Sequence, residues 1–171
     1  GAYEISNDPY FSVARLSLLD RGVVYAVAHV RGGGEMGRQW YEAGKLAAKA
    51  NTFTDFVAVA DALRGTWVDP QRLGAEGGSA GGLLIGAVLN LAPDRFRVAH
   101  AAVPFVDALT SMLDPDLPLT AGEWEEWGNP LADPDAYATM ASYAPYDNVR
   151  PTGYPALLVT TSLHDTRVLV T

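Results

Sequence analysis

Apolar residues recur along this chain at two spacings, and together they predict alternating helices and strands. Helical spacing, in which apolar side chains return every three or four positions, is found over 13–20, 51–64 and 81–91. Short apolar runs typical of buried strands cover 23–30, 72–76, 98–103 and 156–162. Strands that alternate with helices favour a doubly wound, mostly parallel sheet with right-handed crossovers.

Local residues specify two of these elements further. Thr52 and Asp55 fit a capping box at the start of the 51–64 helix. The segment 23–30 is apolar almost throughout and rich in β-branched residues, which is typical of a strand covered on both faces. It leads into a glycine-rich loop at 31–34.

The segment 107–146 interrupts the alternation, because it contains five prolines and two tryptophans within an acidic run. It follows the predicted strand at 98–103. Ligands of open α/β sheets bind beyond the carboxyl ends of the strands. We therefore expect this segment to lie above the sheet and to shape a pocket.

The composition is that of one compact domain, with 49% hydrophobic and 19% charged residues among 171. No repeat or interdomain linker interrupts it. The chain begins Gly1-Ala2-Tyr3 without a methionine and ends in an apolar run at 168–171. We expect residues 1–171 to be a partial domain, truncated at both ends.

Charge and residue usage exclude several classes of function. A net charge of −8 disfavours binding to nucleic acid or to an anionic membrane, and fits either a cationic ligand or simple solubility. The absence of cysteine and the scatter of only three histidines argue against a metal centre, so we expect no cofactor. The chain lacks an apolar run of about 18 residues and a basic-then-apolar leader, which predicts a soluble, cytoplasmic protein.

The sequence Gly-Gly-Ser-Ala-Gly-Gly at 77–82 contains the pattern G-x-S-x-G between a predicted strand and a predicted helix. This context is typical of a nucleophile elbow, in which a sharp turn exposes a serine hydroxyl. Ser79 would be the nucleophile. The N–H of Ala80 would donate to the oxyanion, helped by the dipole of the following helix.

Other interpretations of this segment are an incidental serine in a glycine-rich turn and a phosphate-binding loop. A P-loop would require Gly-Lys-Ser/Thr at its end, and the glycines at 77–82 lack the G-x-G-x-x-G spacing of a dinucleotide site. The nucleophile elbow is the better interpretation.

In folds with such an elbow, the catalytic acid and then the histidine follow the serine along the chain. Asp165 comes shortly after the predicted strand at 156–162 and fits the acid, although a solvated loop aspartate is the alternative. His29, His100 and His164 all precede Asp165, and each is compatible with a structural role. We therefore expect the catalytic histidine to lie outside this chain.

Four motifs together resemble the prolyl oligopeptidase family of serine peptidases, and its oligopeptidase B group in particular. They are GGSAGG, HVRGGGEMG, SLHDTRV and above all GEWEEWGNP. The resemblance covers essentially the whole chain. It implies an α/β-hydrolase domain, normally preceded by a β-propeller, that cleaves short peptides after arginine or lysine.

The resemblance also assigns roles to individual residues. Ser79 matches the nucleophile, Ala80 an oxyanion donor and Asp165 the orienting acid. A second oxyanion donor, a tyrosine hydroxyl, would immediately precede Gly1. Arg167 matches a position that contacts the substrate backbone in some related enzymes.

Acidic residues would select the substrate. Glu123 and Glu125 match the carboxylates that hold a basic P1 side chain, and Trp127 matches an aromatic wall of that pocket. Asp8 matches one acid of a P2-binding pair whose second member is replaced here by Tyr10. Without the resemblance, Glu123, Glu125 and Glu126 would fit an ordinary solvated acidic helix face.

The sequence thus predicts a serine peptidase domain acting on short basic peptides, and inactive by itself because it lacks the histidine. An esterase or acylaminoacyl peptidase on the same fold is the alternative enzyme, since an elbow alone does not select the acyl substrate. A hydrolase-like module that binds a partner without catalysis is the alternative from another class. Unpaired sheet edges would also allow association with another chain.

Overall fold

The structure is a computed structural model, and it describes residues 1–168. Its α-helices are α1 (Val13–Leu19), α2 (Arg38–Glu42), α3 (Ala50–Thr66), α4 (Ala80–Leu91), α5 (Ala108–Leu113), α6 (Thr120–Trp127) and α7 (Pro134–Tyr143). Its strands are β1 (Gly74–Gly78), β2 (Val98–Ala102) and β3 (Ala156–Thr160). Short 3-10 turns are found at Leu46–Ala48, Pro70–Arg72, Pro93–Arg95 and Tyr146–Asn148.

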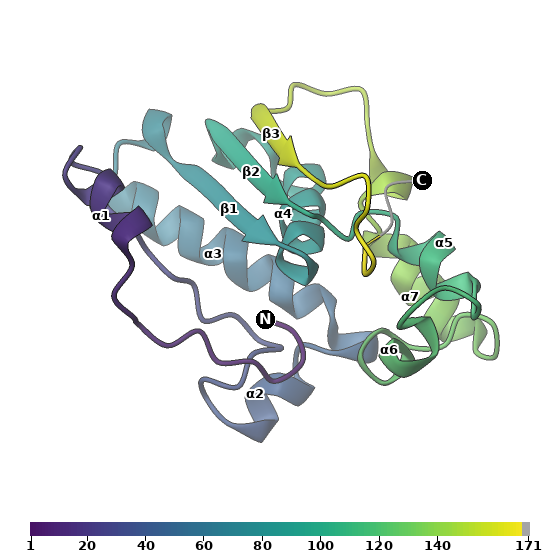
Figure 1. The fold of residues 1–171 in the computed structure, drawn as a ribbon. Helices are drawn as coiled ribbons and strands as arrows, with labels where there is room; N and C mark the ends of the chain where they lie inside the picture. The colour runs from purple at the N-terminus through teal and green to yellow at the C-terminus, as the bar shows by residue number, and fades with distance from the viewer. Residues whose placement is uncertain (169–171) are drawn as a thin grey trace.

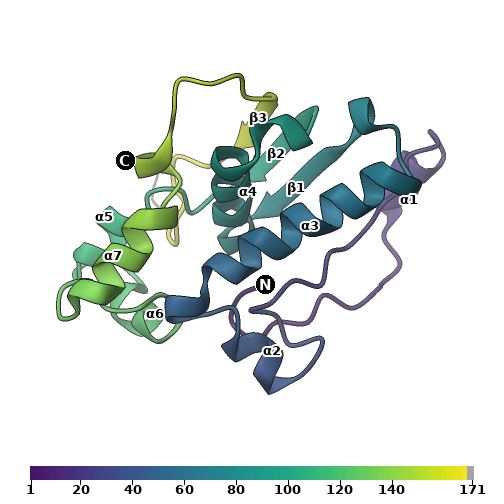
Figure 2. The same ribbon diagram turned by 180° about the vertical axis from the view of Figure 1, so that it is seen from behind.

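The three strands form one parallel sheet in the order β1-β2-β3. Helices α3 and α4 lie on one face of this sheet (Figures 1 and 2). The core forms there, because α4 buries Leu83, Ile85 and Val88 completely. The opposite face carries His100, which lies beside Glu76 in the strand register. The parallel arrangement predicted from the sequence is confirmed.

Most predicted elements are confirmed with small shifts at their ends. The helices expected at 13–20, 51–64 and 81–91 correspond to α1, α3 and α4, and the strands expected at 98–103 and 156–162 correspond to β2 and β3. The strand expected at 72–76 begins two residues later, because Asp69 caps a 3-10 turn that includes Arg72. The longest helix of the described residues, α3, has 17 residues, and none of their helices is long and apolar enough to cross a membrane.

The strand predicted at 23–30 is wrong. This segment runs without strand pairing, and the side chains of Val23, Val24 and Val27 are exposed. A strand requires a hydrogen-bonded neighbour as well as an apolar sequence. In the described sheet β1 pairs with β2 alone, and 23–30 does not join its other edge.

The predicted capping box is also wrong. Helix α3 begins at Ala50, so Thr52 and Asp55 lie inside it. The Thr52 hydroxyl donates to the carbonyl oxygen of Arg31 at 2.7 Å, and Asp55 forms a bidentate ion pair with the Arg31 guanidinium. Both side chains therefore hold the glycine-rich loop against α3 instead of capping the helix.

The segment 107–146 forms the short helices α5, α6 and α7. The strands point toward these helices in Figure 1, so they lie beyond the carboxyl ends of the sheet. This is the position that the sequence predicted for the excursion. It places the acidic helix α6 at the edge where an α/β fold binds its ligands.

Candidate active site

Ser79 occupies a strained turn between β1 and α4. Its backbone has φ 54° and ψ −118°, a conformation that residues with a side chain rarely adopt. Strain of this kind is concentrated at functional sites, where the surrounding structure maintains it. Here the Ser79 N–H donates to the Ala102 carbonyl at 2.9 Å, and the Ser79 carbonyl accepts from the Phe105 N–H at 3.2 Å. The strand-turn-helix context predicted for Ser79 is confirmed.

Two glycines make this turn possible. A Cβ at Gly77 would lie 2.2 Å from the carbonyl oxygen of Gly81, and one at Gly82 would lie 2.5 Å from Pro104. Both separations are shorter than any van der Waals contact. The glycine-rich sequence therefore lets α4 approach β1 and the loop after β2 closely enough to hold Ser79.

Ala80 is the first residue of α4, so its N–H has no acceptor within the helix. The helix has 12 residues, and its positive dipole end lies at this N–H. An oxyanion formed on the substrate next to Ser79 would be stabilised by the Ala80 N–H and by the positive end of the helix dipole. The turn thus places the Ser79 hydroxyl next to a backbone N–H that could serve as an oxyanion donor.

Asp165 follows β3 and shapes a tight turn. Its Oδ1 accepts hydrogen bonds from the N–H groups of Val168 and Arg167, both at 2.9 Å. These two backbone hydrogen bonds lower the pKa of the Asp165 carboxyl group, so it is ionised at neutral pH. Because β1, β2 and β3 are parallel, Ser79, which follows β1 directly, and Asp165, which follows β3 by five residues, both come after the carboxyl ends of their strands.

The rings of His29 and His100 have partners other than Ser79. The His29 ring lies 3.0 Å from the carbonyl oxygen of Asn7. On β2, the His100 ring lies between Glu76 at 3.3 Å and the Thr160 hydroxyl at 3.1 Å. His164 is exposed next to Asp165. These contacts agree with the structural role expected for His29 and His100.

Glu123 on α6 is fixed by two donors from different parts of the chain. The Tyr3 hydroxyl donates to its Oε2 at 2.5 Å, and the Trp127 indole N–H donates to the same oxygen at 2.6 Å. Burial, followed by the hydrogen bond to Glu123, raises the pKa of Tyr3, so the hydroxyl keeps its proton. Among residues 1–168, Oε1 of Glu123 receives no hydrogen bond and stays available to a ligand.

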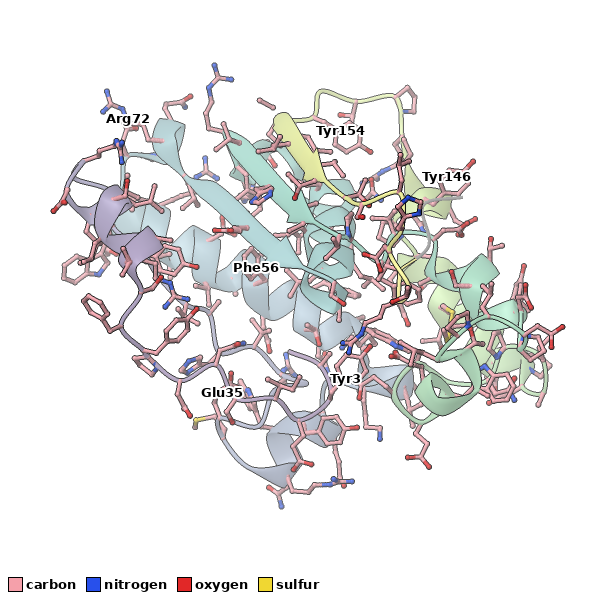
Figure 3. All side chains as sticks on the ribbon, viewed as in Figure 1. Tyr3, Glu35, Phe56, Arg72, Tyr146 and Tyr154 are labelled. Atoms are coloured by element: carbon pink, nitrogen blue, oxygen red, sulfur yellow. The ribbon has the colours of Figure 1, made fainter. Side chains whose placement is uncertain are left out.

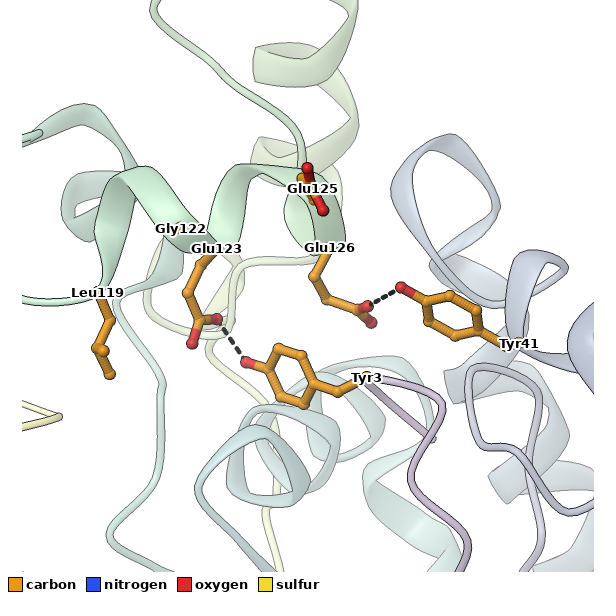
Figure 4. Close-up of a pocket in the computed structure, with 7 residues that line it drawn as sticks. All are labelled: Tyr3, Tyr41, Leu119, Gly122, Glu123, Glu125 and Glu126. Carbon is orange, nitrogen blue, oxygen red and sulfur yellow. Dashed lines mark hydrogen bonds between the residues drawn. The ribbon is translucent and has the colours of Figure 1, made fainter.

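A cavity of about 410 Å³ opens beside this carboxylate. It is lined by Tyr3, Tyr41, Leu119, Gly122, Glu123, Glu125 and Glu126 (Figure 4). Glu125 is exposed, whereas Glu126 is buried and accepts from the Tyr41 hydroxyl at 2.8 Å. A solvated acidic face is therefore the wrong description of Glu126. The three carboxylates make this cavity suitable for a cationic group.

The serine turn and the acidic cavity are joined through two aromatic residues. Phe105, which donates its N–H to the Ser79 carbonyl, packs its ring 5.9 Å from that of Trp127. Trp127 in turn holds Glu123. In Figure 3 Arg72 lies at the amino end of β1, while Tyr3 lies below the carboxyl ends of the strands. Ser79 and the α6 carboxylates therefore belong to one region of the fold.

The remaining predicted site residues lie apart from this cavity. Trp127 is 1% exposed and packs behind Glu123, so it contacts the carboxylate and does not line the cavity. Asp8 is exposed in the N-terminal segment, and Arg167 is exposed in the turn formed by Asp165. Neither Asp8 nor Arg167 is among the residues that line the cavity with Glu123.

Residues 9–171 match the model of the prolyl oligopeptidase family. This chain belongs to that family. The resemblance drawn from GGSAGG and GEWEEWGNP is thereby confirmed, and with it the α/β-hydrolase fold.

Among relatives in the prolyl oligopeptidase family, dipeptidyl aminopeptidase BI of Pseudoxanthomonas mexicana is 54% identical over 98% of this chain and 23% of its own length. Protease 2 of Moraxella lacunata is 52% identical over 98% of this chain and 24% of its own. The structure of oligopeptidase B from Leishmania major superposes with a TM-score of 0.95 at 54% identity, covering 99% of this chain and 24% of that one. The chain thus spans about a quarter of the length of these family members.

Sequence reasoning missed three residues that contact the α6 carboxylates: Tyr3, Tyr41 and Lys49. Tyr3 lies 120 positions from its partner Glu123, and no local pattern marks it. Lys49 is buried and lies 3.6 Å from Glu126, which lines the cavity. Only the tertiary structure joins these residues to α6.

Proposed function

We propose that this chain carries the nucleophile and the P1-selecting carboxylates of a serine peptidase that hydrolyses short peptides after arginine or lysine. The observation that most supports this proposal is that the strained Ser79 turn occurs together with Glu123. Two hydrogen bonds hold Oε2 of Glu123, and its Oε1 can accept from a substrate. The similarity to oligopeptidase B of Leishmania major supports the choice of a peptidase.

In this proposal the Ser79 hydroxyl attacks the scissile carbonyl while the Ala80 N–H stabilises the oxyanion. Asp165, ionised and held by two backbone donors, orients the histidine that takes the serine proton. That histidine belongs to a segment outside this chain, so the 171-residue chain alone is proposed to be inactive. Collapse of the tetrahedral intermediate gives an acyl-enzyme, which water then hydrolyses.

The cavity at α6 would take the P1 side chain. A guanidinium or ammonium group that leaves water without a partner costs several kcal/mol, and Glu123 offsets that cost. With arginine, a carboxylate can accept two parallel hydrogen bonds. Glu125 adds negative charge at the exposed side of the cavity. Asp8 and Arg167 are proposed to contact the substrate farther along, at P2 and at the peptide backbone.

The test compares Glu123→Gln with the unchanged protein in a full-length enzyme that carries this chain. Two substrates are used, one with arginine at P1 and one with citrulline, which has nearly the same shape but no charge. Loss of one partner of a buried charge pair predicts a fall of about 2–5 kcal/mol in transition-state stabilisation for the arginyl substrate. The citrullinyl substrate should change much less.

Glu125→Gln is the matched control, since Glu125 lines the same cavity but is exposed. It should give a smaller loss in the same direction. Equal losses for both substrates with Glu123→Gln would make Glu123 a structural residue. No loss for either substrate would remove it from the site.

A further inference from the structure

Lys49 is a buried lysine next to Glu126, one of the residues that line the acidic cavity. It immediately precedes α3, and 1% of its surface is exposed. Its Nζ donates to the carbonyl oxygen of Gly1 at 2.8 Å and lies 4.7 Å from the centre of the Trp127 ring. The ammonium group therefore touches the N-terminal segment and α6 at the same time.

Glu126 supplies the opposite charge. Its Oε1 lies 3.6 Å from Lys49 Nζ, and its Oε2 accepts from Tyr41. Burial lowers the pKa of Lys49 to about 8, while the attraction of Glu126 acts in the opposite direction. Lys49 therefore still carries its charge at neutral pH, and the two buried groups balance each other.

The two elements that Lys49 joins are those that carry the donors to Glu123. Gly1 is two residues from Tyr3, and the Trp127 ring faces the ammonium group. Tyr3 and Trp127 also contact each other, with an edge-to-face ring arrangement at 5.7 Å and a hydrogen bond of 3.2 Å. A shift of the N-terminal segment relative to α6 would separate Tyr3 from Glu123.

We propose that Lys49 is a positioning residue for the Glu123 carboxylate: it fixes the N-terminal segment on α6, so that Tyr3 and Trp127 both hold Oε2 and leave Oε1 to the substrate. This inference rests on the proposed role of Glu123 at P1. A guanidinium group requires a carboxylate at a fixed distance and angle, so a small displacement of Glu123 weakens the ion pair sharply. A purely structural buried ion pair would not favour one substrate over another.

The experiment uses a full-length enzyme that carries this chain, with the arginyl and citrullinyl substrates. Lys49→Met removes the ammonium group and keeps the length of the side chain. Because this leaves Glu126 as an uncompensated buried charge, the double variant Lys49→Met/Glu126→Gln removes both charges together. Lys45→Met is the matched control. Lys45 lies 4.6 Å from the centre of the Tyr41 ring, so this substitution also removes one positive charge near the cavity.

Displacement of a positioned group by about 1 Å costs up to about 100-fold in rate, so kcat/KM for the arginyl substrate should fall by about 10- to 100-fold in both Lys49 variants. The citrullinyl substrate and the Lys45→Met variant should change little. An unchanged ratio of kcat/KM between the arginyl and citrullinyl substrates would overturn the positioning role. Failure of both Lys49 variants to fold would also overturn it.

Glu123→Gln, measured in parallel, separates this inference from the proposed function. If Glu123→Gln keeps the preference for arginine over citrulline, the proposed function fails. If Glu123→Gln abolishes that preference and the Lys49 variants retain it, only the role of Lys49 fails.

Discussion

Replacement of Gly77 by alanine tests whether the close approach of α4 to β1 holds the serine turn. The added Cβ would lie 2.2 Å from the carbonyl oxygen and 2.7 Å from the carbonyl carbon of Gly81, and 2.9 Å from Cγ1 of Ile85. Two of these atoms are backbone, and Ile85 is completely buried, so no rotamer change relieves the contact. Either α4 moves as a unit or the turn at Ser79 opens.

The expected cost follows from the rigidity of these neighbours. Overpacking of a core costs about 1–3 kcal/mol, and a clash with helix backbone should give a value of about 3 kcal/mol. Gly81→Ala is the matched control in the same motif. Apart from its chain neighbours and the backbone of its own helix, no atom lies within 4 Å of the Cβ added at Gly81, and alanine inside a helix gains about 0.5–1 kcal/mol over glycine.

Urea unfolding followed by tryptophan fluorescence measures both variants. With a urea dependence of about 1–3 kcal/mol per molar, Gly77→Ala should lower the midpoint by about 1 M or more, and Gly81→Ala should leave it equal or higher. Equal midpoints for the two variants, or a larger loss with Gly81→Ala, would refute the argument from close approach.

Two further predictions concern catalysis by the isolated chain and the charge of Lys49. The purified 171-residue chain should hydrolyse a peptide substrate no faster than its Ser79→Ala variant, because loss of one triad member costs several powers of ten in rate; turnover that disappears on Ser79→Ala would instead direct attention to His100 or His164. The native pKa of Lys49, about 8, is below its ordinary value of 10.5, so its contribution to stability is complete above 10.5 and is lost as the pH falls through 8. Relative to Lys49→Met, the free energy of unfolding of the unchanged protein should therefore rise between pH 8 and 9.5, by up to about 1.4 kcal/mol per pH unit. Urea unfolding at each pH measures it, and parallel plots of unfolding free energy against pH for the two proteins would contradict this.

The sequence predicted the serine turn well because all of its determinants are local. Strand, glycines, serine and helix follow one another over 74–91, and the glycines at 77 and 82 are needed where the backbones meet. The helices α3 and α4 were likewise visible in the spacing of apolar residues. Only the exact start of β1 required the structure.

Long-range pairing explains what the sequence could not predict. The segment 23–30 has the composition of a buried strand, but pairing depends on a neighbour that the pattern does not specify. Thr52 and Asp55 have the spacing of a capping box, yet their partner is Arg31, more than 20 positions away. Glu126 resembles a surface acid until Lys49, 77 positions earlier, is placed beside it.

The central claim is that Ser79 is an activated nucleophile, and covalent labelling tests it most directly. A full-length enzyme that carries this chain is treated with a fluorophosphonate, digested and mapped by mass spectrometry. Only a serine with a base and an oxyanion donor should react readily, so the label is predicted on Ser79 and should be absent from Ser79→Ala. A label on another serine, such as Ser111 or Ser162, or an unlabelled enzyme that still hydrolyses peptides, would contradict the account.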